Sequence, residues 1–194
     1  MTTSVIGKLW LLSAVLCFTP LAVAEEYAKP HAGGYDWVAD CLDKARGRSD
    51  GECGFSIDRS SLWSLLLDGL IEAKQNGKWG FVNRTGKVVV PFQYDSAYWF
   101  TDGLAAVKQN GKWGFINLKG KLVTPLQYDA VEPFFDGLAL VEQNGKYGFI
   151  NTAGDVAIPL QYDFAFSFEH DGSARVRLND EPFRINKQGN RLPD

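Results

Sequence analysis

The sequence predicts a mainly β protein: an open, twisted tandem array of short antiparallel β-hairpin repeats behind a small helical N-terminal prefix. Two observations lead to this fold class. A segment of about 34 residues recurs three times without a gap, which is typical of repeat architectures. Each copy also carries an Asn-Gly dipeptide between two short β-prone runs, the strongest short-range hairpin pattern.

Residues 1–24 have the features of a secretory signal peptide. Lys8 supplies the positive region, residues 9–18 are mostly apolar, and Ala22 and Ala24 place small side chains where signal peptidase cuts. The apolar run is shorter than the about 20 residues that a stable transmembrane helix needs. An uncleaved anchor is the alternative. We expect cleavage, export to the periplasm or the exterior, and no membrane insertion of the mature chain.

Residues 25–61 form the predicted N-terminal prefix. Within residues 36–46 the apolar side chains, among them Trp37 and Cys41, fall on one face of a predicted helix, and Gly47 ends it.

Two cysteines remain after the signal peptide has been removed, Cys41 and Cys53. In an oxidising compartment an even, closely spaced pair predicts a structural disulfide. A metal site or a redox pair is disfavoured, because the spacing is not C-x-x-C and no histidine accompanies the cysteines.

The repeat domain is predicted to span residues 62–194. Its three good copies start at Asp68, Asp102 and Asp136, and a degenerate fourth copy follows from Asp171 after one inserted residue. A worn terminal copy is expected to act as a cap for the array.

The second copy illustrates the strands that we expect in each repeat. Three short antiparallel strands are predicted, at residues 104–108, 113–117 and 121–126. Asn110-Gly111 suits the type I′ turn between the first two strands, and Gly120 suits the turn before the third. Pro125 cannot donate to a ladder, so it should lie at a strand end or an edge. A longer return segment then leads to the next copy; the return segments are residues 96–101, 130–135 and 164–170.

The recurring motif is N-G-K-[WY]-G-F-[VI]-N-x-x-G, then P-[FL]-Q-Y-D, then D-G-L. It resembles the WG (KWG) repeat family of bacterial β repeats over about residues 62–194. The fourth copy departs from the motif, because Pro182-Phe183 stands where Trp-Gly would be. The resemblance implies a β-hairpin array and no common activity. Since closed propellers need at least about four blades of four strands, we expect the array to stay open.

Composition and motifs exclude several classes of function. The net charge of −3 becomes more negative when Lys8 is removed, and no Lys/Arg cluster favours nucleic acid. No G-x-G-x-x-G or P-loop motif predicts a nucleotide, so no cofactor is expected. His31 and His170 have no Ser or Cys partner suggested by sequence, so no catalytic residue is assigned. No metal-ligand pattern is found.

The recurring aspartates could be paired carboxylates of a glycosidase, or they could serve the turns. Glycosidases need two carboxyl groups about 5–10 Å apart with different pKa values. These aspartates recur beside every turn, whereas an active site is normally unique, so we expect each to hydrogen-bond its own turn backbone. They are Asp68, Asp102, Asp136, Asp95, Asp129 and Asp163.

The recurring aromatic column, Trp79, Trp113 and Tyr147, could be a stacking platform for sugars or part of the core. We favour the core, because Phe81, Phe115 and Phe149 follow on the same face.

The non-recurring aromatic residues of the return segments are the predicted binding residues. They are Tyr98, Trp99, Phe135, Phe164 and Phe166. Bridging between repeats is the alternative role for these rings. The resulting hypothesis is an exported, non-catalytic binding or scaffold module with an unknown protein or glycan partner. The alternative is an envelope glycan hydrolase that uses a carboxylate pair such as Asp163 with Glu169.

Overall fold

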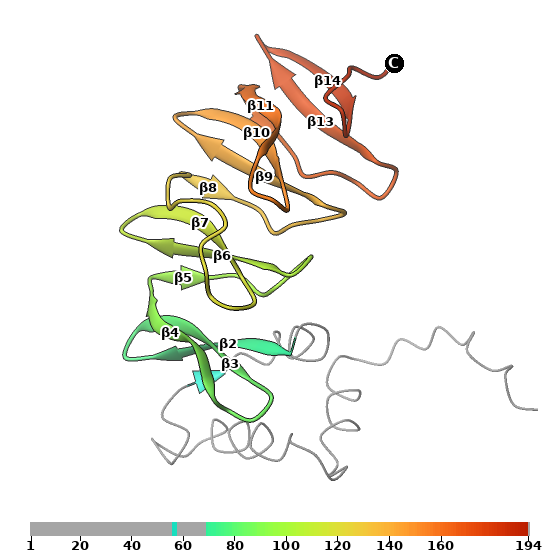
Figure 1. The fold of residues 1–194 in the computed structure, drawn as a ribbon. Helices are drawn as coiled ribbons and strands as arrows, with labels where there is room; N and C mark the ends of the chain where they lie inside the picture. Colours follow the sequence, from blue (N-terminus) through green and yellow to red (C-terminus); the bar gives the residue numbers. More distant parts are fainter. Residues whose placement is uncertain (1–55, 58–68, 194) are drawn as a thin grey trace, which may run out of the picture. The chain divides into compact units, whose positions relative to one another are not determined.

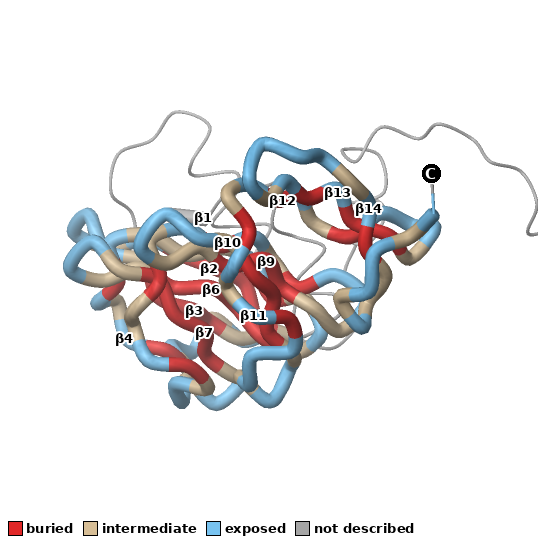
Figure 2. Tube along the Cα trace, turned by 90° about the horizontal axis from the view of Figure 1, so that it is seen from above, coloured by how far each residue is buried: buried red, intermediate tan, exposed pale blue. Residues whose placement is uncertain are grey.

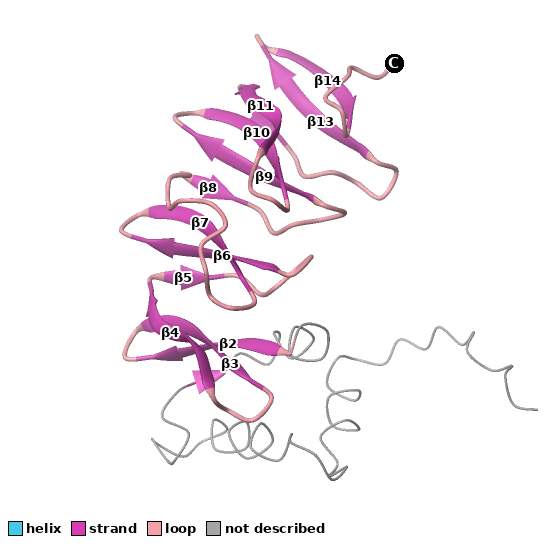
Figure 3. Cartoon of the chain, viewed as in Figure 1, coloured by secondary structure: helices cyan, strands magenta, loops and turns pink. Residues whose placement is uncertain are grey.

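The computed structural model describes residues 56–57 and 69–193, which form fourteen β-strands and no helix (Figures 1 and 3). The described part of the chain accordingly has no helix long and apolar enough to span a membrane. The predicted fold class, a mainly β repeat array built of open antiparallel sheets, is confirmed. The predicted signal peptide, the helix at 36–46 and the Cys41–Cys53 pair lie outside the described residues.

Every copy contributes one hairpin of two six-residue strands. The hairpins are β2 (Leu70–Gln75) with β3 (Lys78–Asn83), β6 (Leu104–Gln109) with β7 (Lys112–Asn117), β9 (Leu138–Gln143) with β10 (Lys146–Asn151), and β13 (Ser173–Leu178) with β14 (Glu181–Asn186). The predicted type I′ turns are present: Asn110 and Gly111 have φ values of 51° and 81°. In the fourth copy Asn179-Asp180 takes the same conformation, with φ values of 53° and 63°.

The remaining strands show that the second, third and fourth sheets are each shared between two copies, while the first sheet takes β1 from the residues before the first copy. They are β1 (Ser56–Ile57), β4 (Val88–Tyr94), β5 (Ser96–Ala97), β8 (Ala130–Val131), β11 (Val156–Tyr162) and β12 (Phe164–Ala165). The sheet orders are β1-β2-β3-β4, β5-β6-β7, β8-β9-β10-β11 and β12-β13-β14. Strands β5, β8 and β12 begin the return segments, so each return segment supplies the first strand of the next sheet. The sequence had suggested three strands per repeat and missed this short strand.

The recurring Trp-Gly and Pro positions meet at a bulge. Trp79 pairs with Tyr94 while Phe81 pairs with Val90, so the edge strand β4 has extra residues opposite Gly80. A Cβ atom on Gly80 would lie 2.5 Å from the carbonyl oxygen of Val90. The proline of the motif is accommodated here because a bulged edge strand needs no donor at that position.

The third strand of the second copy is reduced to two isolated bridges, Trp113 with Tyr128 and Ile116 with Leu122. Thr124 replaces the valine or isoleucine of the other copies, and its hydroxyl accepts the N–H of Phe115 at 2.9 Å. A side chain that takes a ladder hydrogen bond competes with regular strand pairing. The strand predicted at 121–126 is therefore irregular.

The core lies along the strands and between successive sheets. Figure 2 shows the buried positions along the strands and the exposed positions at the turns. A phenylalanine of each return segment packs against the fully buried phenylalanine of the preceding hairpin. These ring pairs are Phe81–Phe100, Phe115–Phe134 and Phe149–Phe168, with centroids 4.8, 4.9 and 4.8 Å apart. Each return segment is thus anchored by one buried ring.

Candidate functional site

The aspartate after each Tyr connects two successive repeats. Asp163 accepts a hydrogen bond from Lys146 of its own copy at 2.6 Å and from the backbone N–H of Asn179, in the next hairpin turn, at 2.7 Å. Asp95 does the same with Lys78 and Asn110, and Asp129 with Lys112 and Asn144. The expectation that these aspartates hydrogen-bond their own turns is therefore wrong for this set: they hold the turn of the following copy.

These contacts favour the ionised form of the carboxylates. The hydrogen bond from Lys146, followed by that from the Asn179 N–H, lowers the pKa of Asp163 below its ordinary value. Lys78 and Asn110 lower the pKa of Asp95, and Lys112 and Asn144 lower that of Asp129. A general acid needs the opposite shift, a raised pKa.

The aspartates of the Asp-Gly turns also have structural partners. Asp102 and Asp136 have positive φ values of 50°, as a tight turn requires. The carboxylate of Asp102 accepts the N–H of Gly137 at 2.9 Å, and that of Asp136 pairs with Lys187. Asp68 lies outside the described residues.

The carboxylate pair of the hydrolase alternative is occupied by other contacts. Asp163 is held by Lys146 and Asn179, while Glu169 forms an ion pair with Arg175 at 3.1 Å. No hydrogen bond between Asp163 and Glu169 is present.

The aromatic column is covered to different degrees in the three copies. Trp113 is only 9% exposed, because Tyr98 stacks on it with centroids 5.0 Å apart and an interplanar angle of 4°. Lys108 lies over the same ring, 5.5 Å from its centroid. Trp79 and Tyr147 are half-buried. The core prediction therefore holds for Trp113, whereas Trp79 and Tyr147 keep part of their surface exposed, and Tyr147 is the least covered by neighbouring cations.

The five predicted binding residues divide into two groups. Tyr98 bridges strands through its stack on Trp113, which is the alternative role that the sequence left open. The other four are large, exposed rings: Trp99, Phe135, Phe164 and Phe166. Phe164 and Phe166 lie together, with ring centroids 4.9 Å apart and nearly perpendicular planes.

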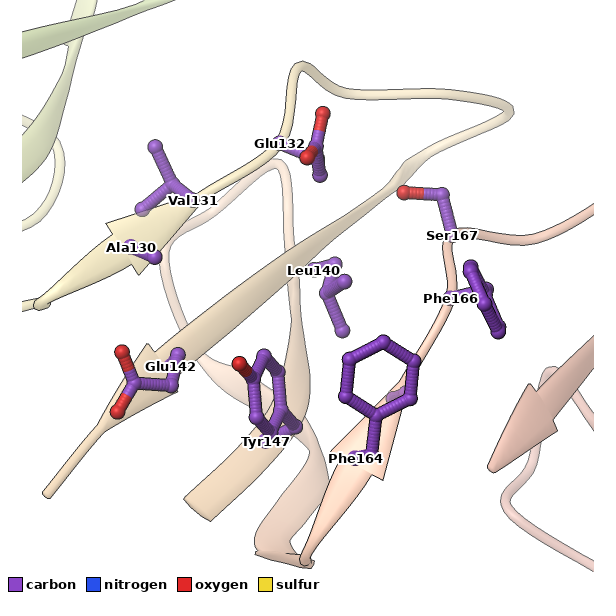
Figure 4. A pocket seen from close by; sticks show the side chains of 10 residues that line it. Ala130, Val131, Glu132, Leu140, Glu142, Tyr147, Phe164, Phe166 and Ser167 are labelled. Atoms are coloured by element: carbon purple, nitrogen blue, oxygen red, sulfur yellow. The ribbon is translucent and has the colours of Figure 1, made fainter. Parts of the chain in front are cut away.

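Phe164 and Phe166 form one side of a hollow of about 400 Å³, which we call the third-repeat hollow (Figure 4). Its floor and walls come from the sheet of β8, β9 and β10 and from β12 of the next sheet. The lining residues are Ala130, Val131, Glu132, Leu140, Glu142, Tyr147, Phe164, Ala165, Phe166 and Ser167. Two of them are acidic and none is basic. Figure 4 shows Glu142 beside Tyr147, with Glu132 and Phe166 on other sides of Leu140.

The corresponding place in the second copy is filled by the chain itself. Tyr98 and Lys108 cover Trp113, and their counterparts in the third copy are Glu132 and Glu142, which line the hollow together with Tyr147. The backbone is equivalent, because the N–H of Tyr98 bonds the Ala106 carbonyl just as that of Glu132 bonds the Leu140 carbonyl. The hollow thus arises from side-chain replacement on an unchanged backbone.

A second hollow, of about 500 Å³, lies at the inserted residue before the fourth copy. Its lining residues are Phe135, Phe168, Glu169, His170 and Asp171. Phe135 and His170 meet edge to face, 5.1 Å apart. The residues that carry charge here are engaged: Glu169 pairs with Arg175, and Asp171 with Arg184.

The repeat pattern matches a known family model. The model for the WG containing repeat matches residues 79–113, 113–147 and 147–181. The chain belongs to the WG-repeat family. Each match runs from one hairpin ring, over a return segment, to the next hairpin, so it spans the junction at which two sheets share a repeat. Comparison with curated proteins gave no match.

The sequence predicted only some of the residues that line the third-repeat hollow. Phe164 and Phe166 were predicted as binding residues, whereas Tyr147 was assigned to the core column and Glu142 was overlooked. The alignment did contain a signal, since Glu142 stands where the first two copies have Lys74 and Lys108. Within residues 56–57 and 69–193 no group of three or more His, Cys, Asp or Glu residues is placed to hold a metal ion. The third-repeat hollow therefore presents aromatic rings and carboxylate groups through which a ligand or partner could be bound.

Proposed function

We propose that this WG-repeat protein is an exported, non-catalytic binding module that holds a partner protein at the third-repeat hollow. The observation that carries the proposal is the exposure of Phe164 and Phe166, 38% and 49%, at the side of a hollow of about 400 Å³. Most large apolar rings of this array are buried between sheets. Exposed rings that line a concavity are typical of binding sites.

The rigidity of the hollow supports this role. Phe164 pairs through β12 with Arg177 of β13, and Phe166 donates its N–H to the Arg175 carbonyl at 3.0 Å. Phe168, two residues later, is buried against Phe149. A preformed surface loses little conformational freedom on binding, which favours affinity.

A protein partner is favoured over a glycan by the state of the ring column. A sugar platform along the column needs ring faces open to solvent in successive copies, but Trp113 is covered by Tyr98 and Lys108, so the column is interrupted in the second copy. Export is proposed from the leader at residues 1–24, which places the partner in the envelope or the exterior.

Capture from an envelope extract tests the proposal when it is made with matched variants. The full chain is immobilised alongside a Phe164→Ser/Phe166→Ser variant and a control, Val156→Ser, which alters an exposed apolar residue outside the hollow. We expect a protein that is retained by the wild type and the control and lost from the double variant. The proposal would be contradicted if the double variant retained the same proteins as the wild type, or if only a glycan were captured. Circular dichroism verifies that all three chains are folded.

A further inference from the structure

We propose that the third-repeat hollow receives a basic side chain of the partner, a lysine ammonium or an arginine guanidinium. The inference rests on the proposed function and specifies the chemistry of the group that enters. It is carried by three observations: the ring of Tyr147, the two glutamates that line the hollow with it, and the way in which the other copies cover the same ring position.

The first two copies supply an internal cation at this position. Lys74 and Lys108 are the cross-strand neighbours of Trp79 and Trp113. Their ammonium groups lie 5.3 and 5.5 Å from the ring centroids. These distances are within the range at which a cation is attracted to the face of an aromatic ring. The hairpin geometry therefore places a cation over the ring.

The third copy has a glutamate at the position that carries the lysine in the first two copies. Glu142 is the cross-strand neighbour of Tyr147, and one of its oxygens accepts the N–H of Gly145 at 2.8 Å. No basic side chain pairs with Glu142 among the described residues. A ring that lacks its cation, beside a carboxylate, is suited to a cation from outside the chain.

The second glutamate extends the same charge pattern. Glu132 replaces Tyr98, and its carboxylate has no hydrogen-bond or ion-pair partner in the described part of the chain. With Glu132 and Glu142 both present, the residues that line the hollow carry two negative charges and no positive one. Charge complementarity therefore favours a cationic occupant over an anionic or neutral one.

The remaining walls suit the hydrocarbon stem of such a side chain. Tyr147 and Phe164 are 5.5 Å apart with an interplanar angle of 56°, and Leu140 and Val131 line the space between the acidic groups. Long basic side chains bury an apolar stem while the charged head keeps polar partners. Arg177 and Arg175 already lie over Phe164 and Phe166, and neither lines the hollow.

NMR titration of the full chain tests the assignment with defined peptides. Acetyl-glycyl-lysyl-glycine amide and its arginine counterpart are compared with the norleucine peptide, which keeps the stem and lacks the charge. We expect saturable shifts of the amides of Glu142, Tyr147 and Phe164 with both basic peptides. The norleucine peptide should bind about tenfold more weakly or not at all. Added salt should weaken the binding of the basic peptides, because it screens the charges of glutamates that lie near solvent.

A variant that copies the second repeat provides the matched test. E132Y/E142K introduces the residues that the second copy has at these positions, Tyr98 and Lys108. We expect this variant to fold like the wild type and to show no chemical-shift changes with the basic peptides. D155K is the control: it reverses a charge outside the hollow and likewise restores the lysine of the other copies, Lys87 and Lys121. Equal affinity for the norleucine peptide, unchanged binding by E132Y/E142K, or no shifts with the basic peptides would overturn the assignment.

The same variants separate this inference from the proposed function. If a partner protein is lost from Phe164→Ser/Phe166→Ser but retained by E132Y/E142K, the hollow binds a partner without a basic side chain, and only the inference fails. If neither double variant affects capture, both fail.

Discussion

The Oδ2 atom of Asp129 accepts a hydrogen bond from the backbone N–H of Asn144 at 2.9 Å. Asp129 lies in the second copy, just before the return segment 130–135, and Asn144 begins the hairpin turn of the third copy. The other carboxylate oxygen pairs with Lys112 of the second copy, the copy to which Asp129 itself belongs. One side chain therefore joins two sheets at their turn ends, while the paired phenylalanines join them in the core.

Removal of this carboxylate should weaken the junction between the second and third copies. Asp129→Ala leaves the Asn144 N–H and Lys112 without their partner, so we expect a lower melting temperature. Asp155→Ala is the control, because the Asp155 side chain is exposed and makes no hydrogen bond in the described region. Thermal unfolding followed by circular dichroism compares the two, and equal melting temperatures would show that the junction does not depend on Asp129.

Stability should fall in acid because of the same carboxylates. The pKa values of Asp95, Asp129 and Asp163 are lowered in the folded chain, chiefly by lysine hydrogen bonds and then by the N–H of the next turn. A lowered folded-state pKa stabilises the fold above the unfolded pKa, about 3.9, and this stability is lost as the pH falls through the folded value. Urea unfolding between neutral pH and acid should show the loss below about pH 4.

A variant with asparagine at all three positions provides the comparison for the acid titration. Its unfolding free energy should depend less steeply on pH than that of the wild type. An unchanged slope would assign the acid sensitivity to other groups.

Gly114 should tolerate no side chain. A Cβ atom there would lie 2.8 Å from the Pro125 carbonyl oxygen, and this neighbour is backbone. We expect Gly114→Ala to lower the free energy of unfolding by about 1–3 kcal/mol or more, since the backbone of Thr124 and Pro125 must shift. Lys119→Ala, at an exposed turn position, should change it little. Urea denaturation measures both, and a neutral Gly114→Ala would refute the close approach.

The ring contact between Phe115 and Phe134 should couple a hairpin to its return segment. A double-mutant cycle with leucine at both positions is expected to give a coupling energy of about 0.5–1.5 kcal/mol. The pair Phe115 and Phe168, which belong to different ring contacts, should be additive in the same measurement. Additivity in both cycles would mean that the edge contact contributes nothing beyond burial.

Under the proposed export, the mature chain should begin at Glu25 and be oxidised. Intact-mass spectrometry of the chain purified from the cells that produce it should show loss of residues 1–24. A disulfide between Cys41 and Cys53 should make the mass lighter by a pair of hydrogens than after reduction. A full-length chain retained in membranes would support the uncleaved anchor instead.

Local patterns explain which elements could be predicted from the sequence. The Asn-Gly and Asp-Gly turns depend on φ values that few residues adopt, so two adjacent residues are enough to locate them. The alternation along 113–117 identified Phe115 as a core residue for the same local reason. The short strands such as β8 were missed, because a two-residue strand has no periodicity and exists only through its partner in the next copy.

The candidate site shows the same division. The exposed rings Phe164 and Phe166 could be predicted as departures from the repeat, whereas Tyr98, a departure of the same kind, is packed on Trp113. The sequence does not distinguish a covered ring from an exposed one, because the ring's exposure depends on whether a partner about 15 residues away along the chain packs against it.

The amino-acid sequence by itself determined the repeat, its turns and its buried phenylalanines, because these follow from backbone preferences and side-chain periodicity within one copy. The tertiary structure alone decided that Asp129 holds the turn of the following copy and that Glu132, Glu142 and Tyr147 surround one hollow. Both relationships arise where consecutive copies or adjacent strands meet. Both depend on the distances between charged and aromatic groups of different copies or strands, and the sequence of a single copy does not specify these distances.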